Sequence, residues 1–392
     1  MNPRDKNRFS LVNISSLILY SSVIIIAVCM ISSYMVKTRF DFNVHDITFD
    51  QTSSNDKFLS FKYEYLVPKH CKNKLIIVPK KGENSITRIA VFTDHNYPHS
   101  LSGDVGYFGF TNHLRAHLHY NDSDIPVTDV SAQELFDTIS SDLANNTATE
   151  SAIVIQGGIL PDILYDQNLG WENIKKWIDK GGTMFWAGEI PGYKYGKRIT
   201  ENGGGAISLD PGAVNSLVDS RIYYETNQKK SDLADTATKN TKFSEIFDFK
   251  YFYTVRAPLA RGVKWNNGKD NGAALGRILP SSDQEHNLSS ISLLPTGEGN
   301  IVIFGGGIFY NSFTKEEEIA TDIAKIINFG ILDMAENGDA VYSEEIQQFS
   351  NNLSYGEIID LPISISTDEV KIILKSICIA NEINQIKSFT VK

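Results

Sequence analysis

The sequence predicts an α/β protein, in which a parallel sheet with helices on both faces is combined with a small antiparallel β domain and one N-terminal transmembrane helix. Three observations predict it. No Asp, Glu, Lys or Arg occurs between residues 9 and 36. Short apolar runs alternate with helical patterns through residues 86–333, as in parallel α/β sheets. The two flanks of that region, 40–85 and 334–392, show the two-residue period of strands instead.

The uncharged stretch ends in LILYSSVIIIAVCMISSYMV, residues 17–36, which is long enough to cross about 30 Å of hydrocarbon as a helix. A cleaved signal peptide would have a shorter apolar stretch and a small-x-small cleavage site. Cys29 follows Val28 rather than the small residue expected in a lipoprotein signal. We therefore expect residues 9–36 to remain as a membrane anchor.

The charges on either side of the anchor predict its orientation. The tail 1–8 holds three basic residues and one Asp, whereas the two basic residues after the helix are soon offset by acidic ones. Basic flanks stay on the cytoplasmic side. The expected protein is a single-pass protein of the cell membrane with a cytoplasmic N-terminus, and its bulk is extracytosolic. Its net charge of −10 argues against nucleic acid as a partner.

The chain has three cysteines, and one of them, Cys29, lies in the anchor. Cys71 and Cys378 lie near the two ends of the outer part, where a disulfide could persist. The alternative is two separate buried thiols, because the sequence does not give their separation. Five sequons are compatible with a glycoprotein, although the first lies at the membrane: Asn13, Asn121, Asn145, Asn287 and Asn352.

Strand patterns occupy both flanks. In the first flank, apolar and polar residues alternate from Leu59 to Val67, 75–78 is a second apolar run, and 40–56 is a spacer or an edge strand. The second flank has runs at 358–365, 369–380 and 386–391. Neither set is large enough for a sandwich alone. We expect the two sets to pair in one antiparallel domain that contains Cys71 and Cys378.

The α/β domain, residues 86–333, is built from strands followed by helices. A capping box at Ser131 and Glu134 opens one helix, and another at Thr314 opens the last one. Gly181 and Gly330 are expected to end helices. The expected strands are 88–94, 151–158, 183–189 and 300–307, the expected helices are 110–120, 131–143, 171–178 and 314–329, and 193–295 is an insertion with strands and long loops.

Polar residues and glycines follow several of these strands. Ligands of open parallel sheets bind beyond the carboxyl ends of the strands, where the strand order reverses. The candidate ligand-binding residues are Asp94, His95, His99, Gly157, Gly158, Glu189, Tyr193 and Gly306.

Two of these segments carry a family resemblance. IVIQGGILP, residues 153–161, resembles the strand-Gly-Gly-x-x-Pro turn of the class I glutamine amidotransferase-like superfamily, and FWAGEIPGY, residues 185–193, falls at its G-x-C-x-G nucleophile elbow. The resemblance implies a flavodoxin-like core over 86–333. It places Ile190 where the family has its nucleophilic thiol, and the family's His-x-Glu pair is absent. The resemblance thus implies a degenerate domain with no catalytic residues, and we expect no cofactor.

Two functions remain in competition. The first is binding or assembly in the cell envelope, with a protein or glycan partner on the aromatic-rich insertion. The second is a hydrolase of envelope carbohydrate that uses Glu189 with Asp94, His95 or His99 as acid and base.

A metal site is the less favoured interpretation of two further histidines. His113 and His117 lie four residues apart on a predicted helix, as metal ligands can. No Glu follows His113 as in zinc proteases, so a solvated helix face is preferred and no metal is expected.

Overall fold

The computed structural model describes most of the α/β region and the strands of both flanks. The predicted anchor lies outside the described residues, and none of the helices described is long and apolar enough to cross a membrane. The described residues are 43–51, 57–64, 71–79, 86–98, 107–120, 123–188, 190–209, 217–218, 240–251, 259–260, 272–280, 287–305, 313–334, 347–351, 358–363, 370–378 and 383–391.

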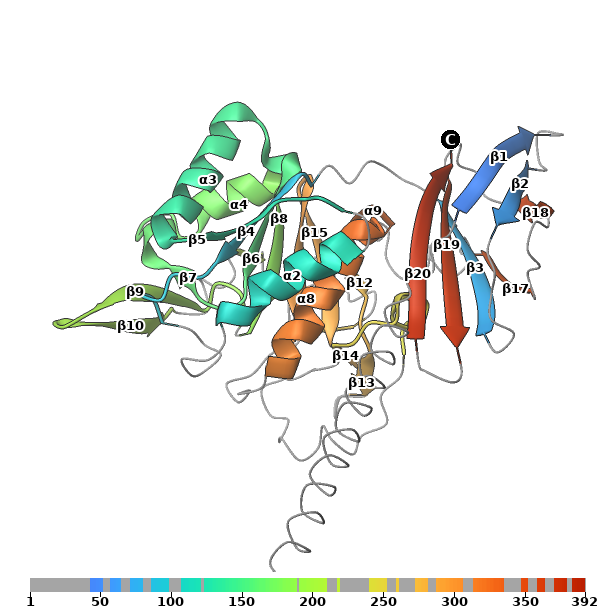
Figure 1. Cartoon of the computed structure of the whole chain (residues 1–392). Helices are drawn as coiled ribbons and strands as arrows, with labels where there is room; N and C mark the ends of the chain where they lie inside the picture. The colour runs from blue at the N-terminus through green and yellow to red at the C-terminus, as the bar shows by residue number, and fades with distance from the viewer. Residues whose placement is uncertain are drawn as a thin grey trace, which may run out of the picture.

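A seven-stranded sheet is the centre of the described α/β region (Figure 1). Its strands follow the order β12-β15-β16-β8-β6-β4-β5, and the five from β16 to β5 are parallel. The prediction of an α/β fold with a mainly parallel sheet is confirmed. The bounds are β4 Arg88–Phe92, β5 Val127–Val130, β6 Ser151–Ile155, β8 Thr183–Ala187, β12 Ala273–Ala274, β15 Ile291–Thr296 and β16 Gly299–Phe304.

The end of the insertion completes this sheet. β15 pairs antiparallel with β16, and β12 pairs antiparallel with β15. Residues 193–295 were predicted to be an insertion with strands and long loops. Their last part supplies the antiparallel edge of the sheet, since β15 forms a hairpin with β16 through Gly297 and Glu298.

Helices cover both faces of the sheet (Figure 1). α2 (Tyr107–Tyr120) and α8 (Phe313–Asn328) bury apolar residues in one core, whereas α3 (Ala132–Asn145) and α4 (Glu172–Asp179) contribute to the other. Alternate residues of each inner strand point into the two cores, as the period of two requires. The remaining short helices are η1 Ala148–Glu150, η2 Asp162–Leu164, α7 Lys242–Phe247 and α9 Ile331–Met334.

Local sequence signals explain the helix ends. The capping box at Ser131 and Glu134 is present, because each residue's side chain bonds the other's backbone N–H. α4 ends before Gly181, whose φ of +104° favours glycine. One prediction was wrong: α8 begins at Phe313, so Thr314, the expected cap, lies inside the helix.

The flanks pair with each other. β2 pairs with β18, and β3 lies between β17 and β19, in antiparallel registers. The described strands form two sheets, β1-β2-β18 and β17-β3-β19-β20, of which β17 was not predicted. The bounds are β1 Asn43–Gln51, β2 Lys57–Glu64, β3 Cys71–Pro79, β17 Gln347–Asn351, β18 Ile358–Ile363, β19 Val370–Cys378 and β20 Ile383–Val391.

A hairpin projects from the α/β region, and we call it the arm (Figure 1). It consists of β9 (Lys194–Thr200) and β10 (Gly203–Ser208), and β9 also pairs in parallel with β7 (Leu160–Pro161). The other short strands are β11 Leu259–Ala260, β13 Ile278–Pro280 and β14 Asn287–Ser289.

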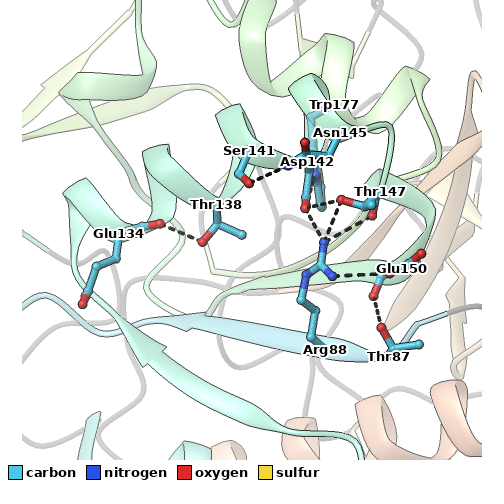
Figure 2. A network of polar contacts seen from close by, with 10 residues as sticks. All are labelled: Thr87, Arg88, Glu134, Thr138, Ser141, Asp142, Asn145, Thr147, Glu150 and Trp177. Atoms are coloured by element: carbon cyan, nitrogen blue, oxygen red, sulfur yellow. Dashed lines mark hydrogen bonds and ion pairs between the residues drawn. The ribbon is translucent and has the colours of Figure 1, made fainter.

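A buried carboxylate ties α3 and α4 to the start of the sheet (Figure 2). Asp142 of α3 forms an ion pair with Arg88 of β4 and accepts hydrogen bonds from Trp177 Nε1 at 2.9 Å and Thr147 Oγ1 at 3.0 Å. Arg88 also contacts Glu150 at 3.4 Å. Three elements are therefore joined through one side chain that is 3% exposed.

A second buried carboxylate holds the insertion on the opposite face. Asp322 of α8 accepts backbone hydrogen bonds from Lys250 at 2.9 Å and Tyr251 at 2.8 Å, and Lys325 Nζ lies 3.6 Å away. Burial raises the pKa of Asp322 to about 6, although Lys325 and the two N–H groups oppose the shift. The chain after α7 is thus fastened to α8.

Replacing Asp142 with Ala should destabilise the protein by about 2–4 kcal/mol, because the buried indole N–H of Trp177 loses its acceptor and Arg88 keeps only the more exposed Glu150 as an ion-pair partner. Urea unfolding would measure the change. Asp137→Ala, at an exposed site on the same helix, is the control and should stay within about 0.5 kcal/mol of wild type. Equal stability of the two variants would contradict the role given to Asp142.

Candidate functional site

The candidate site lies where the strand order of the sheet reverses. From β4 the chain crosses to β5 on one side and then returns to β6 on the other. The segment after β4 therefore meets the segment after β6 at this switch point. Asp94 and His95 follow β4, and Gly157 and Gly158 follow β6, so the structure brings these four predicted residues to one edge.

Asp94 holds the first turn of α3. Its Oδ1 accepts hydrogen bonds from Asn96 N at 3.0 Å and Asn96 Nδ2 at 2.9 Å, and its Oδ2 accepts one from Ala132 N at 3.1 Å. Burial alone would raise the pKa of Asp94. The bonds from Asn96 and Ala132, together with the charge of Arg198, outweigh burial and lower that pKa. The carboxylate is thus ionised, and it accepts hydrogen bonds from the backbone of the same chain.

Tyr97 and Asp162 extend the polar cluster to η2. Tyr97 is 9% exposed, and its ring lies edge-on to Phe92 with centroids 6.1 Å apart. The main cause that raises the pKa of the Tyr97 phenol is its burial. The negative charge of Asp162 and the hydrogen bond to it raise this pKa further. The phenol therefore stays protonated and donates to Asp162.

The arm covers the end of β4. Ile199 N donates to Asn96 O at 2.6 Å, and a Cβ placed on Gly196 would lie 2.9 Å from the Pro98 ring. Gly196 is therefore needed for the close approach of β9 to residue 98. The sequence analysis did not identify this cover. Asn202-Gly203, a common hairpin turn, was the signal that could have indicated it.

The remaining predicted site residues do not converge on one open cleft. His95 is exposed, whereas Gly157 and Gly158 are buried and Gly158 has a φ of +62°. Tyr193 is half-buried, with the Lys194 ammonium 5.9 Å from its ring centroid. His99, Glu189 and Gly306 lie outside the described residues.

The segment with the elbow resemblance makes a tight turn after β8. Gly188 and Gly192 have φ values of +122° and +75°, a region that favours glycine. Gly192 O accepts a hydrogen bond from Trp171 Nε1 at 3.1 Å. Ile190, at the position aligned with the family's thiol, is half-buried.

Three aromatic side chains at the base of the arm were missed by the sequence analysis. The rings of Tyr165 and Tyr195 are stacked with centroids 5.1 Å apart, and Trp171 lies edge-on to Tyr165 at 5.0 Å. Tyr195 is on β9, whereas the other two flank the turn after η2. Tyr165 and Trp171 lie on one local turn, and the pairing of β7 with β9 brings the distant Tyr195 to them.

His117 of α2 lies against α8, so the expectation of a solvated helix face is wrong for this residue. His117 Nε2 is 2.8 Å from Thr321 Oγ1. Burial lowers the pKa of His117, while the nearby Glu317 opposes the shift. Among the described residues, no group of three or more His, Cys, Asp or Glu side chains could hold a metal ion.

Sixteen chains of known structure are similar to this chain, and two of them are cytoplasmic proteins of Salmonella typhimurium. No family model and no curated protein matches the chain. A cytoplasmic protein from Salmonella typhimurium LT2 has 12% identity and a TM-score of 0.32, with 64% of this chain and 99% of that chain covered. A second cytoplasmic protein from Salmonella typhimurium has 10% identity and a TM-score of 0.36, with 64% and 100% covered. The amidotransferase-like resemblance stays a prediction.

Asp94→Ala should lower the free energy of unfolding near neutral pH by about 1–2 kcal/mol, because the first turn of α3 loses its acceptor. The pKa of Asp94 in the folded protein is below its ordinary value of 3.8, so the ionised carboxylate stabilises the folded state above pH 3.8. This stabilisation is lost as the pH falls through the pKa of the folded state. The deficit should therefore shrink in strong acid. Asp124→Ala, at a 95% exposed carboxylate, is the control, and a deficit that grows in acid would contradict the assignment.

Glu316 should make stability depend on pH in the opposite direction. Burial raises its pKa from 4.5 to about 7. The stabilisation is complete below pH 4.5 and is lost as the pH rises through about 7. The free energy of unfolding in urea should therefore fall less for Glu316→Gln than for wild type when the pH is raised from mildly acidic to mildly basic. Asp137→Asn, at an exposed carboxylate on α3, should keep the wild-type profile; the same profile for both variants would refute the prediction.

Proposed function

We propose that this protein is a membrane-anchored, extracytosolic subunit in which a flavodoxin-like, amidotransferase-like domain has no nucleophile and binds a protein partner in the cell envelope. The uncharged segment 9–36 supports the anchor, and the charges around it support the orientation. The elbow-like turn with Ile190 supports the loss of the family's chemistry.

The observation that carries the proposal is the use of the switch-point side chains within the chain itself. Both carboxylate oxygens of Asp94 accept hydrogen bonds from Asn96 and α3, and Tyr97 is bonded to Asp162. A general base must exchange a proton with substrate, which requires a suitable pKa and an accessible lone pair. A lowered pKa and two bonded oxygens make Asp94 a poor base. The carboxyl edge of the sheet at β4 is therefore better suited to holding the arm than to catalysing a reaction.

The arm and its base offer the surface for a partner. Among the described residues, the large hydrophobic side chains that are exposed are Ile163 at 37%, Leu169 at 62% and Ile199 at 53%. η2 contacts β9, so Ile163 and Ile199 belong to adjoining elements. Adjoining exposed apolar side chains mark an interaction surface, whereas sugars are usually stacked on accessible aromatic faces. We therefore favour a protein partner over a glycan.

The alternative is a hydrolase of envelope carbohydrate that uses Glu189 with Asp94, His95 or His99. In that case Asp94 would have to take a proton from substrate, although its pKa is lowered and it already accepts three hydrogen bonds within the chain. Glu189 and His99 lie outside the described residues, and His95 is exposed on the turn after β4. The hydrogen bonds of Asp94 thus favour binding.

Ile199→Asp tests the proposal, because a charge placed in an interface that buries Ile199 should reduce partner recovery at least about tenfold. The full chain would be solubilised gently from membranes, and co-purified proteins would be quantified by mass spectrometry. Ser140→Asp, which adds the same charge at an exposed site on α3, should recover the partner as wild type does.

Three outcomes would contradict the proposal. Wild-type protein that is recovered alone after chemical cross-linking would exclude assembly. Equal recovery with Ile199→Asp would remove the arm from the interface. Equal retention of both variants on an envelope-glycan matrix, with no protein recovered, would favour a glycan partner on another surface.

A further inference from the structure

Two cysteines occupy facing positions in the sheet built from the two flanks. Cys71 is the first residue of β3, and Cys378 is the last residue of β19. The two strands pair antiparallel over nine positions, and the register places Cys378 directly opposite Cys71. Both strands are internal in the order β17-β3-β19-β20. The pairing joins positions 71 and 378 across the whole α/β region.

This register satisfies the backbone requirement for a disulfide. Directly opposite residues of an antiparallel pair have Cα atoms about 5.5 Å apart at hydrogen-bonded positions and about 4.5 Å apart at the others. Disulfides connect Cα atoms that are about 4.4–6.8 Å apart. Either kind of position therefore lies within the required range. Opposite residues also share one face of the sheet.

We propose that Cys71 and Cys378 form a disulfide that links the two flanks covalently. The chain has three cysteines, and Cys29 lies in the segment predicted to span the membrane, so each of these two is the other's partner in the outer part. The proposal rests on the extracytosolic location proposed above, because disulfides persist in oxidising compartments. It goes beyond that function by assigning a covalent modification.

The bond forms by thiol–disulfide exchange with an oxidised dithiol oxidoreductase as the electron acceptor. One cysteine thiolate attacks the disulfide of the oxidoreductase and forms a mixed disulfide, which releases one thiolate of that enzyme. The second cysteine thiolate then attacks the sulfur of the first and displaces the oxidoreductase. The chain loses two protons and two electrons, and the oxidoreductase leaves as a dithiol.

The register fixes which strands the bond joins. β3 leads directly into the α/β region, and β19 follows it, so the disulfide closes the chain around that region. A cross-link between distant positions removes conformational freedom from the unfolded chain more than from the folded one. Reduction should accordingly lower the melting temperature of the sheet formed by β17, β3, β19 and β20.

Peptide mapping of the full chain tests the proposal. Cells would be broken in N-ethylmaleimide, and the chain would be purified in detergent and digested without reduction. The expected result is a peptide containing Cys71 joined to one containing Cys378, which separates on reduction. In Cys71→Ser, Cys378 should carry the alkylating group. Cys29→Ser is the matched control and should keep the cross-link.

Alkylation of both cysteines in the unreduced wild-type digest would overturn the proposal, as would a link from either one to Cys29 or to a second chain. Incubation of the alkylation-free chain in oxidised glutathione then identifies which premise failed. If the Cys71–Cys378 link forms in oxidised glutathione, the compartment of the protein in the cell is reducing, which contradicts the proposed location. The binding of a protein partner would still be decided by the Ile199→Asp experiment. Failure to form the link in oxidised glutathione would contradict the register.

Discussion

Two carboxylates, one at each end of α3, fasten that helix to β4. Asp142, near the end of the helix, pairs with Arg88 at the start of β4, and Asp94, just after β4, accepts a hydrogen bond from Ala132 N at the start of the helix. The helix runs opposite to the strand, so the start of the helix lies at the end of β4 and Asp142 lies at the start of β4. Neither end of α3 can shift without breaking a bond at a buried or half-buried carboxylate.

This double attachment determines the chemistry of the switch point. The edge where β4 and β6 separate is the usual ligand site of such sheets, and its polar residue here is already a ligand of the helix N-terminus. The backbone carbonyl of Asn96, on the same turn, accepts the N–H of Ile199 and so attaches the arm. At a position that commonly binds an external anion, the chain places its own carboxylate. The turn after β4 therefore contacts both the start of α3, through the Asp94 side chain, and the arm, through its backbone.

The local elements could be predicted from the sequence, because their signals are local. The inner strands are continuous apolar runs, and Ser131 with Glu134 marks the start of α3 in sequence as it does in the structure. The pairing of the insertion with the sheet could not be predicted, because a short apolar run such as β15, which is buried on both faces, does not show which strand it pairs with. His117 was misjudged for a similar reason: its partner Thr321 is more than two hundred residues away in sequence.

The role of Asp94 illustrates why the candidate site was harder to predict than the fold. An acidic residue at the end of a parallel strand can be a ligand-binding group or the acceptor for the next helix, and the residue type is the same in both cases. The distinction depends on which N–H groups point at it. The three bonds from Asn96 and Ala132 decide the matter for Asp94, and none of them is visible in the spacing of residues.

The arm differs in charge from the rest of the chain. Lys194, Lys197 and Arg198 on β9 are opposed by Glu201 alone, whereas the whole chain carries a net charge of −10. Gly204 has a φ of +139°, and a Cβ there would lie 2.3 Å from Arg198 O, so the two strands approach more closely than a side chain would permit. The basic residues and Ile199 are therefore presented on a closely paired ribbon attached at Asn96. A ribbon whose backbone is already paired loses less conformational entropy on binding, and its basic residues would complement acidic groups on the protein partner proposed above.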